Sequence, residues 1–162
     1  MERLWAPWRS QFMADIARGK TFECIFCSRP DGGDKECFIL WRGTHTFMLL
    51  NLYPYNPGHL MVAPYRHVTE YGDLTNEEFA EQQDALRRAI AALRSTTKPD
   101  GFNIGTNLGK AAGAGFPHLH THLVPRWSGD ANFMATVAEA KLVSESLETT
   151  YGKLKEALTK SI

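Results

Sequence analysis

Residues 118–124 read HLHTHLV, and they place three of the chain's six histidines at every second position. Successive side chains of a β-strand point to opposite faces, so this spacing predicts a strand with His118, His120 and His122 on one face. The residues between them would point to the other face. A polar strand face without a function is a poor explanation for three histidines in strict alternation. The pattern therefore predicts a site in which three imidazoles share one small volume.

A glycine-rich loop over residues 109–115 precedes the histidine strand. Glycine has no side chain to shield its backbone, so such loops offer accessible N–H groups to anions. Imidazoles beside an anion-binding loop indicate phosphorus chemistry or a metal site.

Composition excludes several classes of partner. The chain has 162 residues, 43% of them hydrophobic, which fits one domain with a sizeable core. Lys plus Arg and Asp plus Glu are equal at 18 each, so the overall charge predicts neither a nucleic-acid nor a membrane partner. Neither a long apolar run nor a signal-peptide core is present, and three cysteines fit a disulfide framework poorly. We expect a cytoplasmic protein with reduced thiols.

The order of apolar runs predicts an α+β fold with a five-stranded antiparallel sheet. Besides the histidine strand, four strands are expected, at residues 37–41, 46–50, 59–64 and 101–107. Thr75 and Glu78 form a capping box, which predicts one long helix over residues 76–97. A C-terminal helix is marked by the apolar spacing of Leu147, Tyr151, Leu154 and Leu158.

Three parts of the chain are expected. Residues 1–21 form an N-terminal arm with Trp5, Trp8 and Phe12 at roughly helical spacing. Residues 22–131 form the catalytic domain with a cysteine knuckle, and residues 132–162 form a C-terminal extension that carries the last helix.

The histidine strand and its loop resemble the histidine triad (HIT) superfamily, whose pattern is three alternating histidines followed by apolar residues. Asn51, the Pro57–His59 turn and Asn107 also match. The loop, together with the Pro125–Arg126 pair, looks most like the bacterial and archaeal branch that contains dinucleoside polyphosphate (Ap4A) hydrolases and phosphorylases. The resemblance implies a HIT-like fold and nucleotidyl transfer through a covalent histidine intermediate.

The resemblance also implies roles for the catalytic strand. His120 would attack the α-phosphorus, as a neutral imidazole can near pH 7. His122 would position phosphate oxygens or stabilise the leaving group, and His118 completes the triad. Phosphoryl transfer depends on positioning and charge stabilisation, so phosphate contacts are expected from Asn107, Gly113, Ala114 and Gly115.

Nucleoside recognition is expected from other segments. Asn51 occupies the position that binds ribose hydroxyls in relatives, although an Asn at a strand end is also a common turn residue. Four apolar residues match positions that sandwich the base, although such residues are more often core. They are Ile25, Phe26, Leu49 and Leu52. The substrate is expected to be a nucleotide, with adenine favoured.

Cys24 and Cys27 have the C-x-x-C spacing of a zinc knuckle, which is also a redox spacing. No thioredoxin-like βαβ pattern surrounds them. Zinc-binding relatives add a histidine after the third strand and the first histidine of the triad, which match His67 and His118. The resemblance thus implies structural Zn²⁺ on these four residues, with Cys37 as a rival ligand.

Several alternatives stay open. Ala114 and Gly115 stand where many HIT hydrolases carry Gln and Ser or Thr, so the acceptor could be water or phosphate. A phosphoramidate hydrolase or a nucleotide sensor with little turnover would use the same site. A metallohydrolase is disfavoured because no acidic residue lies between Gly101 and Asp130. His45 and His59 are interpreted as structural.

Relatives pair through the long helix and an adjoining strand, so the resemblance implies a homodimer. The aromatic side chains of the N-terminal arm add apolar surface that is better buried than exposed.

Overall fold

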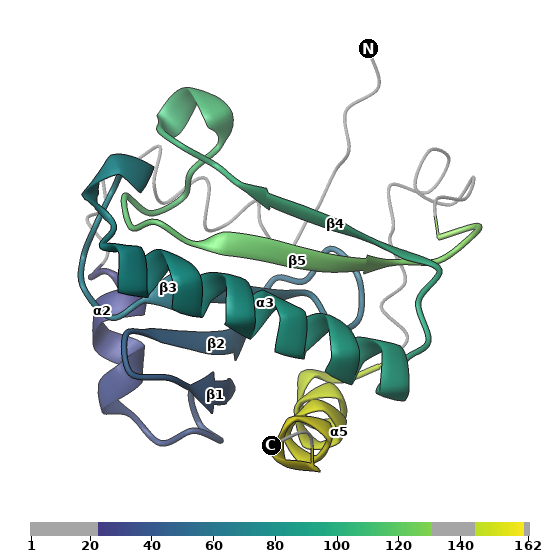
Figure 1. The fold of residues 1–162 in the computed structure, drawn as a ribbon. Helices are drawn as coiled ribbons and strands as arrows, with labels where there is room; N and C mark the ends of the chain where they lie inside the picture. Colours follow the sequence, from purple (N-terminus) through teal and green to yellow (C-terminus); the bar gives the residue numbers. More distant parts are fainter. Residues whose placement is uncertain (1–22, 131–144, 161–162) are drawn as a thin grey trace.

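The computed structural model describes residues 23–130 and 145–160. The predicted N-terminal arm and much of the C-terminal extension lie outside these residues. Five strands form one antiparallel sheet in the order β1-β2-β3-β5-β4 (Figure 1). Their bounds are β1 Ile39–Arg42, β2 Thr46–Leu50, β3 Leu60–Pro64, β4 Gly101–Thr106 and β5 Thr121–Arg126. The predicted α+β fold is confirmed.

Two long helices complete the fold, α3 over Asn76–Thr96 and α5 over Leu147–Lys160. The predicted capping box is present: Thr75 Oγ1 accepts from the Glu78 amide at 3.2 Å, and Glu78 Oε2 accepts from the Thr75 amide at 2.9 Å. Four shorter elements lie in the connections. They are α2 (Ile25–Ser28), η1 (Arg29–Asp31), η2 (Tyr71–Asp73) and η3 (Lys110–Ala112).

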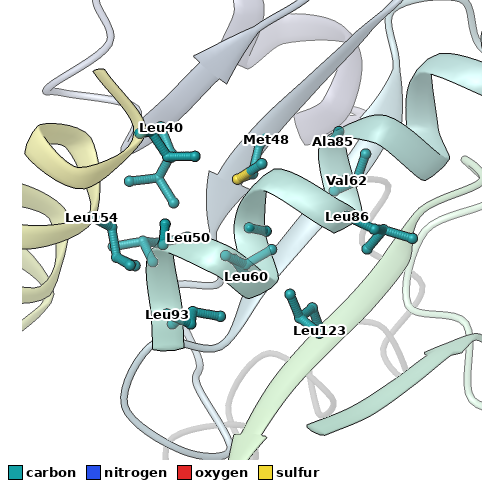
Figure 2. Close-up of a cluster of buried hydrophobic side chains, with 13 residues drawn as sticks. Leu40, Met48, Leu50, Leu60, Val62, Ala85, Leu86, Leu93, Leu123 and Leu154 are labelled. Carbon is teal, nitrogen blue, oxygen red and sulfur yellow. The ribbon is translucent and has the colours of Figure 1, made fainter. Parts of the chain in front are cut away.

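The sheet separates the main core from a second apolar cluster. Helices α3 and α5 pack on one face (Figure 1), and the core between them and the sheet includes Met48, Leu60 and Leu123 (Figure 2). In β2 and β3, the side chains that point away from the main core belong to the second cluster, which also contains Phe26 of α2. That cluster includes Phe47, Leu49, Met61 and Ala63. The registry pairs Met61 with His122, so His122 lies on the face away from α3.

The histidine strand is shorter than predicted. Its assigned pairing begins at Thr121, opposite Thr106 of β4 and Val62 of β3, so His118 and His120 precede the ladder. The amide of Leu119 instead donates to the Val68 carbonyl at 2.7 Å. The extension of the strand is therefore replaced by a contact with the segment that follows β3.

In the described ranges, 23–130 and 145–160, every helix is too short or too polar to cross a membrane.

Candidate active site and metal centre

His120 is held in an orientation suited to nucleophilic attack. It is 6% exposed, and its Nδ1–H donates to the His118 carbonyl at 2.6 Å. Burial lowers the pKa of His120, partly opposed by that hydrogen bond, so the imidazole is neutral near pH 7. In a neutral imidazole with the proton on Nδ1, the lone pair lies on Nε2. Nε2 is therefore the ring nitrogen that could act as a nucleophile.

Phe26 and His122 fix the position of the His120 ring. Phe26 of α2 stacks on it with ring centroids 4.4 Å apart and planes 25° apart, and Phe116 meets Phe26 edge-on at 6.3 Å. The ring of His122 lies 4.8 Å from that of His120, at 71°. The spacing predicts that all three imidazoles share one volume, and His120 and His122 do so.

His118 faces a different group of side chains. Its Nε2–H donates to the Pro64 carbonyl at 3.0 Å, which leaves the Nδ1 lone pair toward Cys24 Sγ at 3.4 Å and Cys27 Sγ at 3.6 Å. Burial, with smaller effects from His67 and His120, lowers the pKa of His118 to about 4, so the ring is neutral. A neutral imidazole with its second nitrogen bonded to a carbonyl is the usual state of a metal-ligating histidine.

The fourth donor is His67, whose Nδ1 lies 3.3 Å from Cys27 Sγ. All four predicted donor atoms lie within 4.8 Å of one another. Tetrahedral zinc, with bonds of about 2.3 Å to sulfur and about 2.0 Å to nitrogen, would separate a sulfur from a nitrogen by about 3.5 Å. The Cys24, Cys27, His67 and His118 group can therefore hold a metal ion of this kind, and Cys37 is not part of it.

The glycine-rich loop is closed by its own hydrogen bonds. Gly109 and Gly113 have φ values of +75° and +88°, which L side chains rarely adopt. The amides of Gly113 and Ala114 donate to loop carbonyls at 3.0 and 3.3 Å, and Asn107 Nδ2 reaches the Gly113 carbonyl at 3.5 Å. Among residues 23–130 and 145–160, no carbonyl or side chain accepts from the Gly115 amide. Of the three predicted loop amides, Gly115 is thus best placed to bind an anion.

Asn51 follows β2 directly and combines two features. Its Oδ1 accepts from the Tyr53 amide at 2.9 Å, which is the turn role considered from the sequence. Its Nδ2 lies 3.4 Å from Nε2 of His59, on the histidine side of the sheet. The turn role therefore does not remove Asn51 from the site.

The four predicted base-contacting residues differ in exposure. Leu49 and Phe26 are 0% and 1% exposed and belong to the apolar cluster under the histidines. Ile25 and Leu52 are partly exposed and thus retain surface that a base can contact.

One contributor was missed from the sequence. His59, interpreted there as structural, is 0% exposed, and its Nε2 lies 3.0 Å from His122 Nδ1. The signal was available, because the strand that begins after His59 is the neighbour of the histidine strand in an antiparallel sheet.

A comparison with known proteins agrees with this geometry. The family model of the HIT domain matches residues 33–129, more than half of the chain. The chain belongs to the HIT domain family.

Two HIT structures and one curated relative are similar. A protein from Mycobacterium tuberculosis named AP-4-A phosphorylase is 41% identical over 157 residues, covering 93% of this chain and 80% of its own. A zinc-bound histidine triad family protein from Mycobacterium smegmatis has 27% identity and a TM-score of 0.70, covering 86% and 95% of the two chains. A hypothetical histidine triad nucleotide-binding protein from Sulfolobus tokodaii has 25% identity and a TM-score of 0.69, covering 85% and 93%.

The predicted HIT fold and the predicted enzyme class, a nucleotide hydrolase or phosphorylase of the HIT family, are therefore confirmed at that level.

Proposed function

We propose that the protein cleaves dinucleoside polyphosphates at the α-phosphorus through a covalent nucleotidyl-His120 intermediate. A bond forms between His120 Nε2 and phosphorus while the P–O bond to the leaving phosphate breaks, and its electron pair leaves with the oxygen. A second acceptor then attacks the same phosphorus and releases His120. The observation that carries this proposal is the 2.6 Å bond from His120 Nδ1–H to the His118 carbonyl, which leaves the lone pair on Nε2.

Other residues position the substrate in this scheme. The Gly115 amide and Asn107 bind phosphate oxygens, and His122 stabilises the leaving group. Asn51 binds the ribose, and the exposed surface of Ile25 and Leu52 contacts the base. Adenine is the proposed base because the AP-4-A phosphorylase relative is named for an adenine dinucleotide.

Phosphate is the acceptor that we favour. The same relative is named a phosphorylase, and Ala114 and Gly115 stand where many HIT hydrolases carry Gln and Ser or Thr. With Ap4A, phosphorolysis yields ADP and ATP, whereas hydrolysis yields AMP and ATP. Product analysis with and without inorganic phosphate distinguishes the two.

The decisive experiment is to trap the intermediate. Wild-type protein is mixed with Ap4A and quenched in base, and intact mass spectrometry is used to detect an acid-labile nucleotidyl adduct. His120→Ala should form no adduct and lose essentially all turnover, while His45→Ala, at an exposed site, should behave as wild type. Near-normal cleavage by His120→Ala, or turnover without any adduct, would refute the mechanism and favour the nucleotide sensor.

The proposed metal is a structural Zn²⁺ on Cys24, Cys27, His67 and His118. Two sulfurs and two imidazoles suit zinc, and four protein ligands leave no open position for substrate. When bound, zinc supplies a crosslink and no chemistry. His120 and His122 lie outside this donor group, so a metallohydrolase using the triad as ligands is not favoured.

A homodimer is also proposed, through α3 and the edge strand β4. Ile104 of β4 is 50% exposed, and with Leu86 and Ile90 of α3 it lines a groove of about 430 Å³. A second copy would bury this apolar edge, and solution scattering at micromolar concentration would give its mass.

A further inference from the structure

Gly105 lies in the middle of β4, directly opposite His122 of β5. β4 is the edge strand beside β5 (Figure 1). Residues that pair directly in an antiparallel ladder point to the same face of the sheet, with Cβ atoms about 4.5–5.5 Å apart. A side chain at position 105 would therefore stand next to His122, on the face away from α3.

The fold itself does not require glycine at this position. The φ angle of Gly105 is not positive, so any L residue could adopt its backbone conformation. In the part of the chain that the structure describes, a Cβ atom at Gly105 would have no atom within 4 Å beyond its two chain neighbours. Glycine weakens a strand, and inside a strand it often marks a place where a ligand or another backbone approaches closely. The space beside His122 is therefore open to a ligand.

This open position lies on the opposite side of β5 from the proposed nucleoside contacts. Asn51 and Leu52 follow β2, which is separated from β5 by β3, whereas β4 borders β5 on its other side. The nucleoside and the leaving group are attached to the same phosphorus. With the nucleoside over β2 and β3 and the α-phosphorus at His120, the leaving group extends toward β4.

The charge of this region suits a polyphosphate. No Asp or Glu occurs over residues 101–129, which include β4, the glycine-rich loop and β5. Asp130, the next carboxylate along the chain, is paired with Arg126. Lys110 of the loop is exposed and cationic. A chain of negatively charged phosphates over β4 thus meets no carboxylate from these residues.

We propose that Gly105 is a specificity-determining residue that leaves room beside His122 for the phosphate chain of a large leaving group. This inference rests on the proposed function, because it assigns the path of the leaving nucleotide in that reaction. With Ap4A the leaving group is ATP, and its phosphates lie over the β4 backbone at Gly105. AMP has the nucleoside and the α-phosphate but no leaving chain, so it does not reach this position.

The test uses one variant and a control on the same strand. Gly105→Val fills the open position. Gly101→Val adds the same side chain to the same face of β4, opposite Arg126 and farther from His122. Gly101 also lacks a positive φ and has no atom within 4 Å of a Cβ in the described residues. Valine is favoured in strands, so neither variant should lower Tm.

Two quantities are measured for each variant: kcat/KM for Ap4A, and the inhibition constant of AMP against Ap4A cleavage. One extra methylene group against a closely fitting site commonly changes kcat/KM by about 10–200-fold. Gly105→Val should therefore lower kcat/KM for Ap4A by about 10-fold or more, while the inhibition constant of AMP changes by less than about 3-fold. Gly105→Ala should lie between wild type and Gly105→Val, and Gly101→Val should resemble wild type in both quantities.

Three results would overturn the inference. One is an unchanged kcat/KM in Gly105→Val, and another is an equal loss in Gly101→Val. The third is AMP binding that weakens as much as kcat/KM falls, because the valine would then disturb the whole site and not the leaving group alone.

The proposed dimer uses the same strand, so the mass of each variant is measured by solution scattering at the assay concentration. If Gly105→Val is monomeric and Ile104→Glu reproduces its loss of activity, the glycine belongs to the subunit contact and the inference is overturned.

Failure of the inference and failure of the proposed function are distinguishable. If wild-type protein forms no nucleotidyl adduct, the proposed function is refuted whatever the behaviour of Gly105→Val. If the adduct forms and Gly105→Val cleaves Ap4A as fast as wild type, the role of Gly105 alone is refuted.

Discussion

Metal removal should destabilise the protein by an amount that can be anticipated. The four donors come from three segments far apart in sequence: the α2 knuckle, the segment after β3 and the segment before β5. A ligand that binds only the folded state stabilises it by about 2.7 kcal/mol at 100 times its Kd and about 4.1 kcal/mol at 1,000 times. For a chain of this size, that corresponds to a fall in Tm of about 5–15 °C on chelation.

The assay combines metal analysis with thermal unfolding. Protein purified without chelator should contain stoichiometric zinc, and Tm should fall with a strong chelator and recover with added Zn²⁺. Cys27→Ser should lose the metal and the chelator response. Cys37→Ser is the matched control, because Cys37 was the rival ligand and lies outside the donor group, so it should retain both.

Two results would refute this reasoning. One is protein that contains no zinc and whose Tm does not respond to Zn²⁺ or chelator. The other is loss of metal in Cys37→Ser with retention in Cys27→Ser, which would restore the three-cysteine alternative.

Three further predictions concern stability and assembly. Glu81 accepts four hydrogen bonds from residues 44–46, between β1 and the start of β2. Glu81→Gln should therefore lower the free energy of unfolding by about 1.5–3 kcal/mol, the usual contribution of a hydrogen bond to a charged group. An unchanged guanidinium midpoint would contradict this. The Arg126 guanidinium, helped by Asn56, holds the pKa of Asp130 below its usual range, so this contribution is complete above about pH 4 and is lost as pH falls further. Asp130→Asn should therefore flatten the stability–pH curve below pH 4 in urea titrations, and a parallel curve would count against it. Ile104→Glu should give a monomer mass in solution scattering where wild type gives a dimer, and a dimer mass for the variant would refute pairing through β4.

Much of the fold could be predicted because the signals were local. The Thr75–Glu78 capping box is a short-range hydrogen-bond pattern, and the helix begins where it predicts, at Asn76. The strands β2 and β4 also lie within one residue of the predicted bounds. Strand ends that depend on tertiary contacts were less predictable. Phe38 adopts a φ of +54°, so β1 begins at Ile39 and not at residue 37.

In the candidate site, too, features set by local sequence could be predicted, whereas features set by tertiary contacts could not. Alternation was sufficient to place His122 on the face of the sheet opposite the core, and the C-x-x-C spacing was sufficient to suggest a metal. The interpretation of His59 as structural missed its 3.0 Å contact with His122, because that contact depends on the pairing of β3 with β5. Likewise, composition could not reveal that the amides of Gly113 and Ala114 are used within the loop.

Successive side chains of β5 point to opposite faces of the sheet, and this limits where the chain tolerates insertions. Leu123 belongs to the core beneath α3, while His122 lies on the opposite face of the sheet, beside His120. Insertion of a single codon between the glycine-rich loop and Leu123 would exchange their faces, burying an imidazole and exposing a leucine. Insertions at the exposed residues Lys110–Ala112 would leave this frame intact. A library of single-codon insertions should therefore recover functional clones in the loop and almost none within the strand.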